Sequence, residues 1–378
     1  MLFASTRGAG HFNPLVPFID AARRLGHEVL VAGPTGLGPV VARTDYPFHE
    51  CADPAEEDIR PVWERVQTVS PDEANVLVVR EIFARYDAAA LLPGLQNAIE
   101  RFRPDLVVRE TAEYGSAVAA ELAGLPHARV GIGLAMFEEQ ATAIAAATVS
   151  ELRESVGLEA DPSGVRIRSA PYLTFFPASL EAPGEPEPPR VHRFRHAVPP
   201  TASPLPDWWN GHAAPLVYVT FGSVAGGLPG GTTVYTTALE ALEGLPLRAL
   251  LTLGAADVDS LGPVPPNVHV EQWVPQHDIL AHAEAVVCHG GSGSTIGALE
   301  AGRPLVVVPL FADQPGNAKR VDAVGAGVSV AATAAAIRAG IEKVLGDPSY
   351  RAAATSLAEE MRLQTPVDEA YALLATAR

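Results

Sequence analysis

The chain has 378 residues, 48% of them hydrophobic, and its 44 acidic side chains outnumber 27 basic ones, for a formal net charge of −17. The length favours two domains over one, and the charge argues against nucleic acid and anionic membrane surfaces as partners. No apolar run reaches the roughly 20 residues that a bilayer-spanning helix needs, so no integral membrane association is expected.

The two cysteines, Cys51 and Cys288, give no disulfide framework, which fits a reducing compartment. The N-terminus reads directly as a strand and lacks the layout of a secretory signal. We therefore expect a cytoplasmic protein. A homodimer is compatible with the sequence, which does not define an oligomeric state.

The first half of the chain alternates between strand-like and helix-like segments. This alternation is typical of a parallel sheet covered by helices on both faces. The expected strands are Met1–Ser5, Glu28–Ala32, Leu106–Arg109 and Ala128–Gly131, and the expected helices are Phe12–Leu25 and Ala112–Gly124.

A proline-rich segment over 183–206 has no periodicity and predicts a semi-rigid linker. The alternation then resumes, so we predict an α/β protein with two Rossmann-like domains, over 1–195 and 207–355. Ligands of such sheets bind beyond the carboxyl ends of the strands. The second set of strands is Leu216–Thr220, Leu247–Leu253, Val268–Val270, Ala285–Cys288 and Leu305–Val308, with helices near Thr233–Leu242 and over Tyr350–Ala377.

His11 follows the first strand and the turn Gly8–Gly10, and it precedes a helix. That position places it at the carboxyl edge of the first sheet, where an imidazole can take a proton from a hydroxyl. The alternative is a polar helix cap. A dinucleotide-binding turn is disfavoured, because Asn13 stands where the third glycine of that motif belongs.

The second half contains a strand that leads into a glycine-rich turn and a helix. Ala285–Cys288 ends at His289, and Ser294 and Thr295 open the helical stretch. Backbone N–H groups and the dipole of such a helix attract an anion, and glycine permits close approach. The predicted diphosphate ligands are His289, Gly291, Ser292, Gly293, Ser294 and Thr295, with Ser223 after the first strand of this half.

Residues on either side of this turn fit the remaining parts of a nucleotide sugar. Trp273 is expected to stack on a base, with Val274 and Gln276 beside it, and domain-edge packing is its alternative. Asp313 and Gln314 follow the next strand and suit sugar hydroxyls, although Asp313 is equally suited to cap a helix.

These segments resemble the nucleotide-sugar signature of family 1 glycosyltransferases, which have the GT-B fold with an interdomain cleft. The shared pattern is Trp, Pro-Gln, His-x-Gly, Ser-Thr and Asp-Gln in this order, with G-A-G-H-F-N-P at Gly8 to Pro14. The resemblance covers most of the chain. Its compact, Ala- and Pro-rich style resembles actinobacterial natural-product, or antibiotic, glycosyltransferases.

The resemblance implies an inverting transferase that moves a sugar from a nucleotide diphosphate sugar to a hydroxyl of a hydrophobic small molecule. His11 would be the base and Glu110, where many relatives have Asp, its orienting partner, with Gly10 in an N-terminal phosphate loop. Residues 356–378 would form a helix that crosses back to the N-terminal domain. Loops near Val62–Tyr86 and Gly133–Ala146, which carry Trp63, Phe83, Met136 and Phe137, would wall the acceptor pocket.

One departure from the family pattern bears on the donor. Relatives that use UDP-sugars usually have Glu eight residues after the histidine, on the ribose hydroxyls, and here that residue is Gly297. We therefore favour a dTDP-sugar over a UDP-sugar, because deoxyribose has lost the 2′-hydroxyl. The alternatives are a GT-B nucleotide-sugar epimerase and a catalytically silent partner of another transferase.

No cofactor or metal ion is expected. Asp257 and Asp259 match the D-x-D metal motif of a different glycosyltransferase fold, but they lie among small residues and are better interpreted as a turn. His269 and His282 have no pairing signal, so we expect them to be ordinary surface or core histidines.

Overall fold

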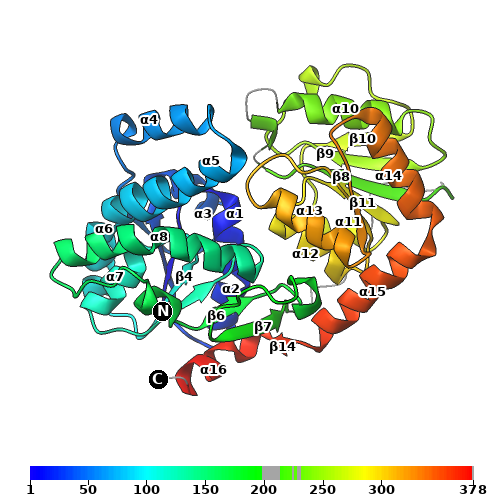
Figure 1. Cartoon of the computed structure of the whole chain (residues 1–378). Coiled ribbons are helices and arrows are strands. Elements are labelled where there is room, and N and C mark those ends of the chain that lie inside the picture. The colour runs from blue at the N-terminus through cyan, green and yellow to red at the C-terminus, as the bar shows by residue number, and fades with distance from the viewer. Residues whose placement is uncertain (198–212, 224, 228–230, 377–378) are drawn as a thin grey trace. The chain divides into compact units, whose positions relative to one another are not determined.

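The computed structural model describes residues 1–197, 213–223, 225–227 and 231–376 (Figure 1). The chain divides into two compact units. Unit 1 comprises Met1–Phe176, Pro183–Ala197 and Thr365–Arg378, and unit 2 comprises Pro177–Ala182 and Val198–Gln364.

Unit 1 is built on a sheet whose paired strands all run parallel, in the order β14-β7-β6-β5-β4-β1-β2-β3. Most residues of its central strands are buried, as in a sheet covered on both faces, and the buried residues of β4 and β5 include Arg109, Glu110 and Arg129. The strands are β1 Leu2–Ala4, β2 Leu30–Pro34, β3 Phe48–Cys51, β4 Val107–Glu110, β5 His127–Val130, β6 Tyr172–Thr174, β7 Val191–Arg195 and β14 Thr365–Pro366.

Helices flank this sheet and bury their apolar faces against it (Figure 1). One of them widens into a π-helix over Val78–Asp87, between α5 and α6. The α-helices are α1 Ala9–Phe12, α2 Val16–Arg24, α3 Gly38–Val41, α4 Glu56–Val66, α5 Pro71–Leu77, α6 Ala88–Phe102, α7 Gly115–Leu122, α8 Ala135–Ser155, α9 Val165–Arg168 and α16 Ala370–Thr376.

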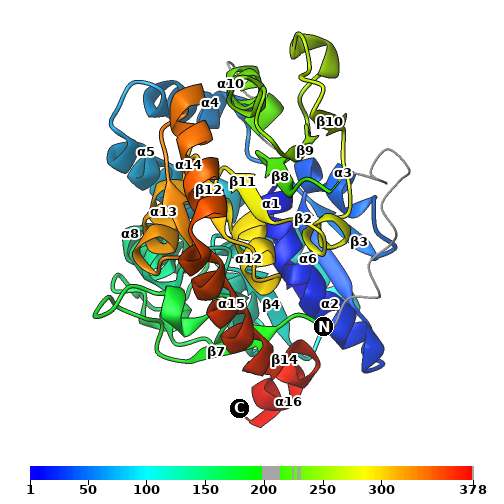
Figure 2. The ribbon, with the colours of Figure 1, turned by 90° about the vertical axis from the view of Figure 1, so that its right-hand side faces the viewer.

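Unit 2 repeats the design with a parallel sheet in the order β10-β9-β8-β11-β12-β13. Helix α15 packs along α12 in this unit (Figure 2). The strands are β8 Leu216–Thr220, β9 Arg248–Thr252, β10 Val268–Glu271, β11 Ala285–Cys288, β12 Leu305–Val307 and β13 Gly327–Ser329. The helices are α10 Thr232–Leu242, α11 Gln276–Leu280, α12 Ser292–Glu300, α13 Gln314–Ala323, α14 Ala334–Gly346 and α15 Pro348–Leu363.

The structure differs from the predicted linker over 183–206. Residues 183–197 belong to unit 1 and include β7, which pairs with β6 and buries Phe194. The prolines flank this strand and do not interrupt it, so each of its residues keeps a backbone N–H for the ladder. Residues 198–206, like the predicted start of the second domain at 207, lie outside the described residues.

The predicted final helix is divided in two. Helix α15 ends at Leu363 within unit 2, and Thr365–Pro366 then pairs with β7 in unit 1 before α16 begins. Pro366 ends the helical run because it lacks an N–H and restricts the residue before it. Tyr371 of α16 donates its hydroxyl to the carbonyl of Phe18 at 2.5 Å, which fixes this last helix to unit 1.

Two further expectations need correction. The segments predicted as loops around Val62–Tyr86 and Gly133–Ala146 are mainly helical, in α4, α5, the π-helix and α8. The helix predicted from Phe12 begins at Ala9 and passes through a 3₁₀ turn, Asn13–Leu15, around Pro14. Both cysteines are buried and free.

The packing of α6 against β3 leaves no room for a methyl group at Gly94. A Cβ there would lie 2.7 Å from the sulfur of Cys51 and 2.8 Å from its Cβ. Gly94→Ala should therefore lower the free energy of unfolding by about 1–2 kcal/mol, because overpacking outweighs the gain in helix propensity. Urea denaturation measures this, and Gly346→Ala, in open space at the end of α14, is the matched control. Unchanged stability of the Gly94 variant would contradict the packing argument.

Candidate active site

In unit 1, the residues expected to do chemistry meet where β1 and β4 end side by side. The two strands pair in register from Leu2 with Val107 to Ala4 with Arg109. His11 lies in α1, after Gly8, whose φ of 101° only glycine adopts readily. Gly10, the predicted phosphate-loop residue, is exposed in the same turn of helix.

Glu110 is fully buried at the end of β4, and its carboxylate accepts three hydrogen bonds. The donors are the backbone N–H of Thr6 at 3.2 Å, its hydroxyl at 2.9 Å, and the N–H of Ala112 at 2.6 Å. Burial disfavours the ionised form, but His11 and these donors outweigh it and hold the pKa of Glu110 below its ordinary value. The group is therefore an ionised carboxylate held in one orientation.

His11 Nδ1 lies 3.3 Å from the Oε1 atom of Glu110, and the imidazole is 22% exposed. Burial lowers the pKa of His11, yet the charge and hydrogen bonding of Glu110, together with the charges of Glu138 and Asp87, exceed that effect and leave the pKa raised. The structure thus brings the predicted pair together. The contact has the distance of an ion pair, and such contacts commonly tighten when substrate binds.

Two further carboxyl groups act electrostatically on His11 and were not predicted from the sequence: Glu138 of α8 and Asp87 at the end of the π-helix. Burial raises the pKa of Glu138 to about 7 and that of Asp87 to about 6. Glu138 accepts the N–H groups of Ile132 and Gly133. No local motif marks either residue, because their relation to His11 arises only from the packing of distant elements.

Phe83, one of the residues predicted to wall the acceptor pocket, lies beside the His11–Glu110 pair. The ring of Phe83 meets the His11 imidazole edge-on, with centroids 5.3 Å apart. Met136 and Phe137 are half-buried at the start of α8, and Trp63 is 41% exposed on α4. The Phe83 contact gives the His11 imidazole an apolar neighbour.

In unit 2, His289 follows β11, next to the end of β8. Its ring lies against the backbone of Gly222 and Gly291, where a Cβ on either glycine would collide with it. Burial lowers the pKa of His289 to about 4, so the imidazole is neutral at pH 7 and donates through one nitrogen. Ser223, the other predicted donor on β8's side, is exposed directly after Gly222.

Helix α12 begins at Ser292, two residues earlier than predicted, with Gly291 at its N-cap. Thr295 is the residue whose predicted role changes. Its N–H donates to the carbonyl of Gly291 at 3.0 Å and its side chain is buried, so it belongs to the helix. The N–H groups that have no partner within the helix are those of its first residues, Ser292, Gly293 and Ser294.

Asp313 occupies the N-cap position of α13, but its side chain makes no capping bond. It instead accepts the hydroxyl of Ser292 at 3.1 Å and the amide of Asn317 at 2.8 Å, which links the start of α12 to the start of α13. Gln314 is buried, and its Oε1 accepts the N–H groups of Leu310 and Phe311. The amide nitrogen of Gln314 is therefore the group suited to a sugar hydroxyl.

Trp273 follows β10 and is 72% exposed, so it is not the domain-edge packing residue of the alternative interpretation. Val274 beside it is half-buried. Gln276 begins α11, and its Nε2 lies 2.5 Å from the place that a Cβ on Gly297 would occupy. The side chain of Gln276 thus fills the space opened by the glycine at position 297.

The D-x-D sequence forms a 3₁₀ turn, with the carboxylate of Asp257 accepting the N–H of Asp259 at 3.0 Å. Within the described ranges, no group of three metal-ligating side chains is present, and no helix is long and apolar enough to cross a membrane. His269 pairs with Glu271 at 2.8 Å, and His282 is exposed.

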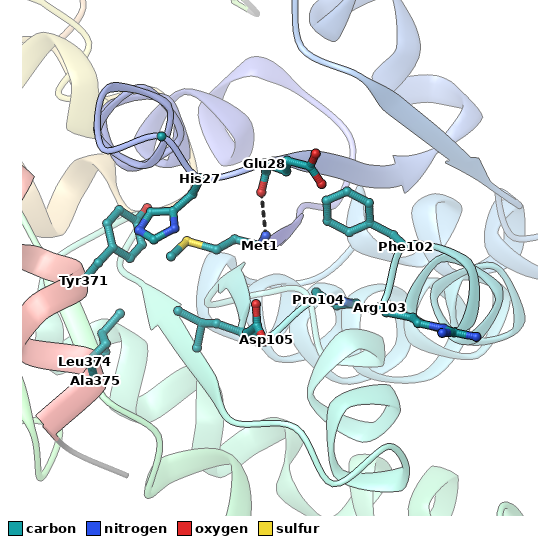
Figure 3. A pocket seen from close by; sticks show the side chains of 12 residues that line it. Met1, His27, Glu28, Phe102, Arg103, Pro104, Asp105, Tyr371, Leu374 and Ala375 are labelled. Carbon is teal, nitrogen blue, oxygen red and sulfur yellow. Dashed lines mark hydrogen bonds between the residues drawn. The ribbon is translucent and has the colours of Figure 1, made fainter.

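A cavity of 450 Å³ lies at the opposite edge of the unit 1 sheet, where β1 and β4 begin (Figure 3). Its lining includes Met1, His27, Asp105 and Tyr371, and none of the predicted site residues. The amine of Met1 donates to the carbonyl of Glu28 there, at 2.6 Å. Parallel sheets bind ligands at their carboxyl ends, so this cavity is separate from the candidate active site.

Comparison with known proteins agrees with this architecture. Models of the erythromycin biosynthesis protein CIII-like N-terminal and C-terminal domains match residues 20–162 and 237–374. The chain is 31% identical to L-demethylnoviosyl transferase of Streptomyces niveus, over 100% of this chain and 98% of that protein.

Two solved structures share the fold. The glycosyltransferase SnogD from Streptomyces nogalater has a TM-score of 0.81 at 26% identity, over 100% of this chain and 98% of its own. Spinosyn rhamnosyltransferase SpnG, complexed with thymidine diphosphate, has a TM-score of 0.83 at 21% identity, over 99% of each chain.

The fold is therefore GT-B, as predicted, and the chain is a glycosyltransferase. It belongs to the erythromycin biosynthesis protein CIII-like family of actinobacterial natural-product glycosyltransferases. The resemblance seen in the sequence is thus confirmed, and transfer is supported over the epimerase and silent-partner alternatives.

The contact between His11 and Glu110 predicts a measurable change in the titration of His11. Glu110→Gln should move the pKa of His11 from above its ordinary value of 6.5 to below it, because burial persists when the carboxylate is lost. NMR titration of the imidazole C–H signals measures this shift. Asp45→Asn, an exposed acid paired with Arg23, is the control and should leave His11 unchanged. An unaltered His11 titration in the Glu110 variant would disprove the coupling.

Proposed function

We propose that the chain is an inverting glycosyltransferase that moves a sugar from a dTDP-sugar to a hydroxyl of a hydrophobic natural product. The observation that carries this proposal is the His11–Glu110 contact of 3.3 Å at the carboxyl edge of the unit 1 sheet. A base in that place, oriented by an ionised carboxylate, suits deprotonation of an acceptor hydroxyl.

The reaction is a single displacement. The Nδ1–H of His11 faces Glu110, so Nε2 is the nitrogen that accepts the hydroxyl proton. The acceptor oxygen attacks the anomeric carbon as the bond from that carbon to the diphosphate oxygen breaks, which inverts the configuration. Glu110 then stabilises the imidazolium by its charge.

The leaving diphosphate is assigned to the N-terminus of α12. Ser292, Gly293 and Ser294 supply backbone N–H groups, and neutral His289 supplies one more donor. These groups stabilise the negative charge of the leaving diphosphate without a basic side chain, so the reaction as proposed needs no metal ion. Turnover that is unchanged by EDTA is the expected result.

The donor sugar is assigned to dTDP because of position 297. A glycine there offers no carboxylate to a ribose 2′-hydroxyl, and the amide of Gln276 fills the space. An amide nitrogen donates hydrogen bonds and cannot replace an acceptor. SpnG binds thymidine diphosphate on the same fold, but this proposal depends on residues 276 and 297.

The proposed acceptor class rests on the family and on apolar side chains of unit 1, of which Phe83 contacts His11. L-demethylnoviosyl transferase is, by its name, a sugar transferase, and relatives of this family act in antibiotic pathways. Phe83, Met136 and Phe137 are suited to a hydrophobic aglycone.

His11→Ala is the test of the proposed base. Turnover should fall by about 10²–10⁴, the usual contribution of a general base, with nucleotide affinity unchanged. The assay is transfer from dTDP-hexoses to a panel of hydroxylated polyketide aglycones, with product detection by mass spectrometry and anomeric configuration by NMR. His282→Ala, an exposed histidine of unit 2, is the matched control. Near wild-type turnover in the His11 variant would refute the role.

The donor assignment predicts a change in nucleotide preference at position 297. Wild type should bind dTDP at least as tightly as UDP, and Gly297→Glu should shift preference towards UDP by about 1–2 kcal/mol at most. The new side chain must displace the amide of Gln276, which offsets part of the gain. Calorimetric dissociation constants of both nucleotides decide the question, with Gly346→Glu as the charge control. A wild-type protein that prefers UDP several-fold contradicts the assignment.

A further inference from the structure

Arg109 is a buried arginine that directly precedes Glu110 on β4. It is 1% exposed, and its Nη1 donates to three backbone carbonyls: Glu110 at 3.1 Å, Thr111 at 3.0 Å and Glu113 at 2.9 Å. The first carbonyl is that of the last residue of β4, and the other two belong to the turn that follows the strand. One guanidinium therefore determines which way these peptide groups face.

One of these peptide groups, between Thr111 and Ala112, also contacts the carboxylate of Glu110. The carbonyl of Thr111 and the N–H of Ala112 belong to the same trans peptide, so they point in opposite directions. Arg109 holds the carbonyl, and the N–H donates to Oε2 of Glu110 at 2.6 Å. Successive hydrogen bonds of this kind polarise one another. The chain of contacts runs from guanidinium to peptide to carboxylate to the imidazole of His11.

Arg129, the neighbour of Arg109 in the sheet, makes the burial of Arg109 unfavourable in free energy. Arg129 is its register partner on β5, is equally buried, and lowers the pKa of Arg109 in addition to the larger effect of burial. A packing role alone would be served better by an apolar side chain, because two adjacent buried cations repel each other. Arg129 bonds elsewhere, to the carboxylate of Glu139 at 3.1 Å and the carbonyl of Arg168 at 3.0 Å.

We propose that Arg109 is a positioning residue of the active site, which fixes the carboxylate of Glu110 against His11 through the Thr111–Ala112 peptide. The inference rests on the proposed function, since its catalytic consequence requires His11 to be the base. Arg109 does not touch the substrates in this scheme. It acts through the turn that it organises.

The test compares Arg109→Lys with Arg129→Lys. Both variants keep a buried cation beside β4 and β5, but lysine lacks the planar fork that holds several carbonyls at once. In the Arg109 variant, kcat should fall at least tenfold with the dissociation constant for dTDP unchanged. The NMR titration of His11 should also move to lower pH, because a less firmly held Glu110 raises the pKa of His11 less. The Arg129 variant should keep the wild-type kcat and titration.

Glu138 and Asp87, the other carboxyls that act on His11, are retained in both variants. Because the side chain of Thr111 in this turn also interacts with Glu138, the shift is compared with that of Glu110→Gln, which removes the charge of Glu110 alone. A wild-type kcat and His11 titration in Arg109→Lys would overturn the proposal. An equal loss of kcat in both lysine variants, with no movement of the His11 titration, would show that Arg109 has only a packing role. That result would also overturn the proposal. Arg109→Gln, which keeps amide donors without the buried charge, is the second variant if the lysine variant does not fold.

Failure of the proposed function gives a different result. If His11→Ala retained full turnover, the base would be wrong. The His11 titration in Arg109→Lys would still show whether Arg109 positions Glu110. The two conclusions are therefore tested by separate measurements.

Discussion

The unit 1 site depends on keeping one carboxylate ionised in the interior. Glu110 has no exposed surface, so each of its oxygens needs a partner that repays the loss of water. Thr6 from the end of β1 and the peptide after β4 meet this need because the two strands are neighbours in a parallel sheet. His11 then lies beside a fixed negative charge. The order of the strands thus determines the electrostatic environment of His11.

The candidate diphosphate site of unit 2 consists of uncharged groups that are suited to bind an anion. In the proposed function, a protein with a net charge of −17 binds a dianionic diphosphate at a site whose assigned residues include no lysine or arginine. The N-terminus of α12 and the neutral imidazole of His289 supply donors without adding a cation that would need its own partner. Asp313 is compatible with this arrangement because Ser292 and Asn317 already donate to it.

Strand positions were predictable from the sequence because buried parallel strands are short apolar runs with polar or glycine ends. Ala285–Cys288 and Leu216–Thr220 agree to the residue. Features that depend on distant partners were not predictable. The strand Val191–Arg195 is hidden among prolines, and its identity comes from pairing with β6 and β14. The ten-residue π-helix over 78–87 likewise has no local signature.

The same distinction applies to the site. His11, Glu110 and His289 stand next to strand ends, where the chain order alone indicates proximity to a ligand. Gln276 and Gly297 are 21 positions apart, so nothing in the sequence indicates that the amide of one fills the space left by the other. The sequence identifies Arg109 only as part of a strand, because its three carbonyl contacts form only when the turn is folded.

The carboxyl groups around His11 constrain how strong a base it can be. Glu110 raises the pKa of the imidazole, and full ionisation of Glu138 and Asp87 would raise it further. An imidazole that holds its proton too firmly is mostly protonated at neutral pH and cannot accept another. Burial limits this effect at Glu138, whose pKa it raises to about 7, so that this carboxyl is partly neutral near pH 7, whereas Asp87, with its pKa raised to about 6, is still mostly ionised there. In the proposed reaction, ionised Glu110 orients the imidazole, and the partial neutrality of Glu138 limits how far the pKa of His11 is raised.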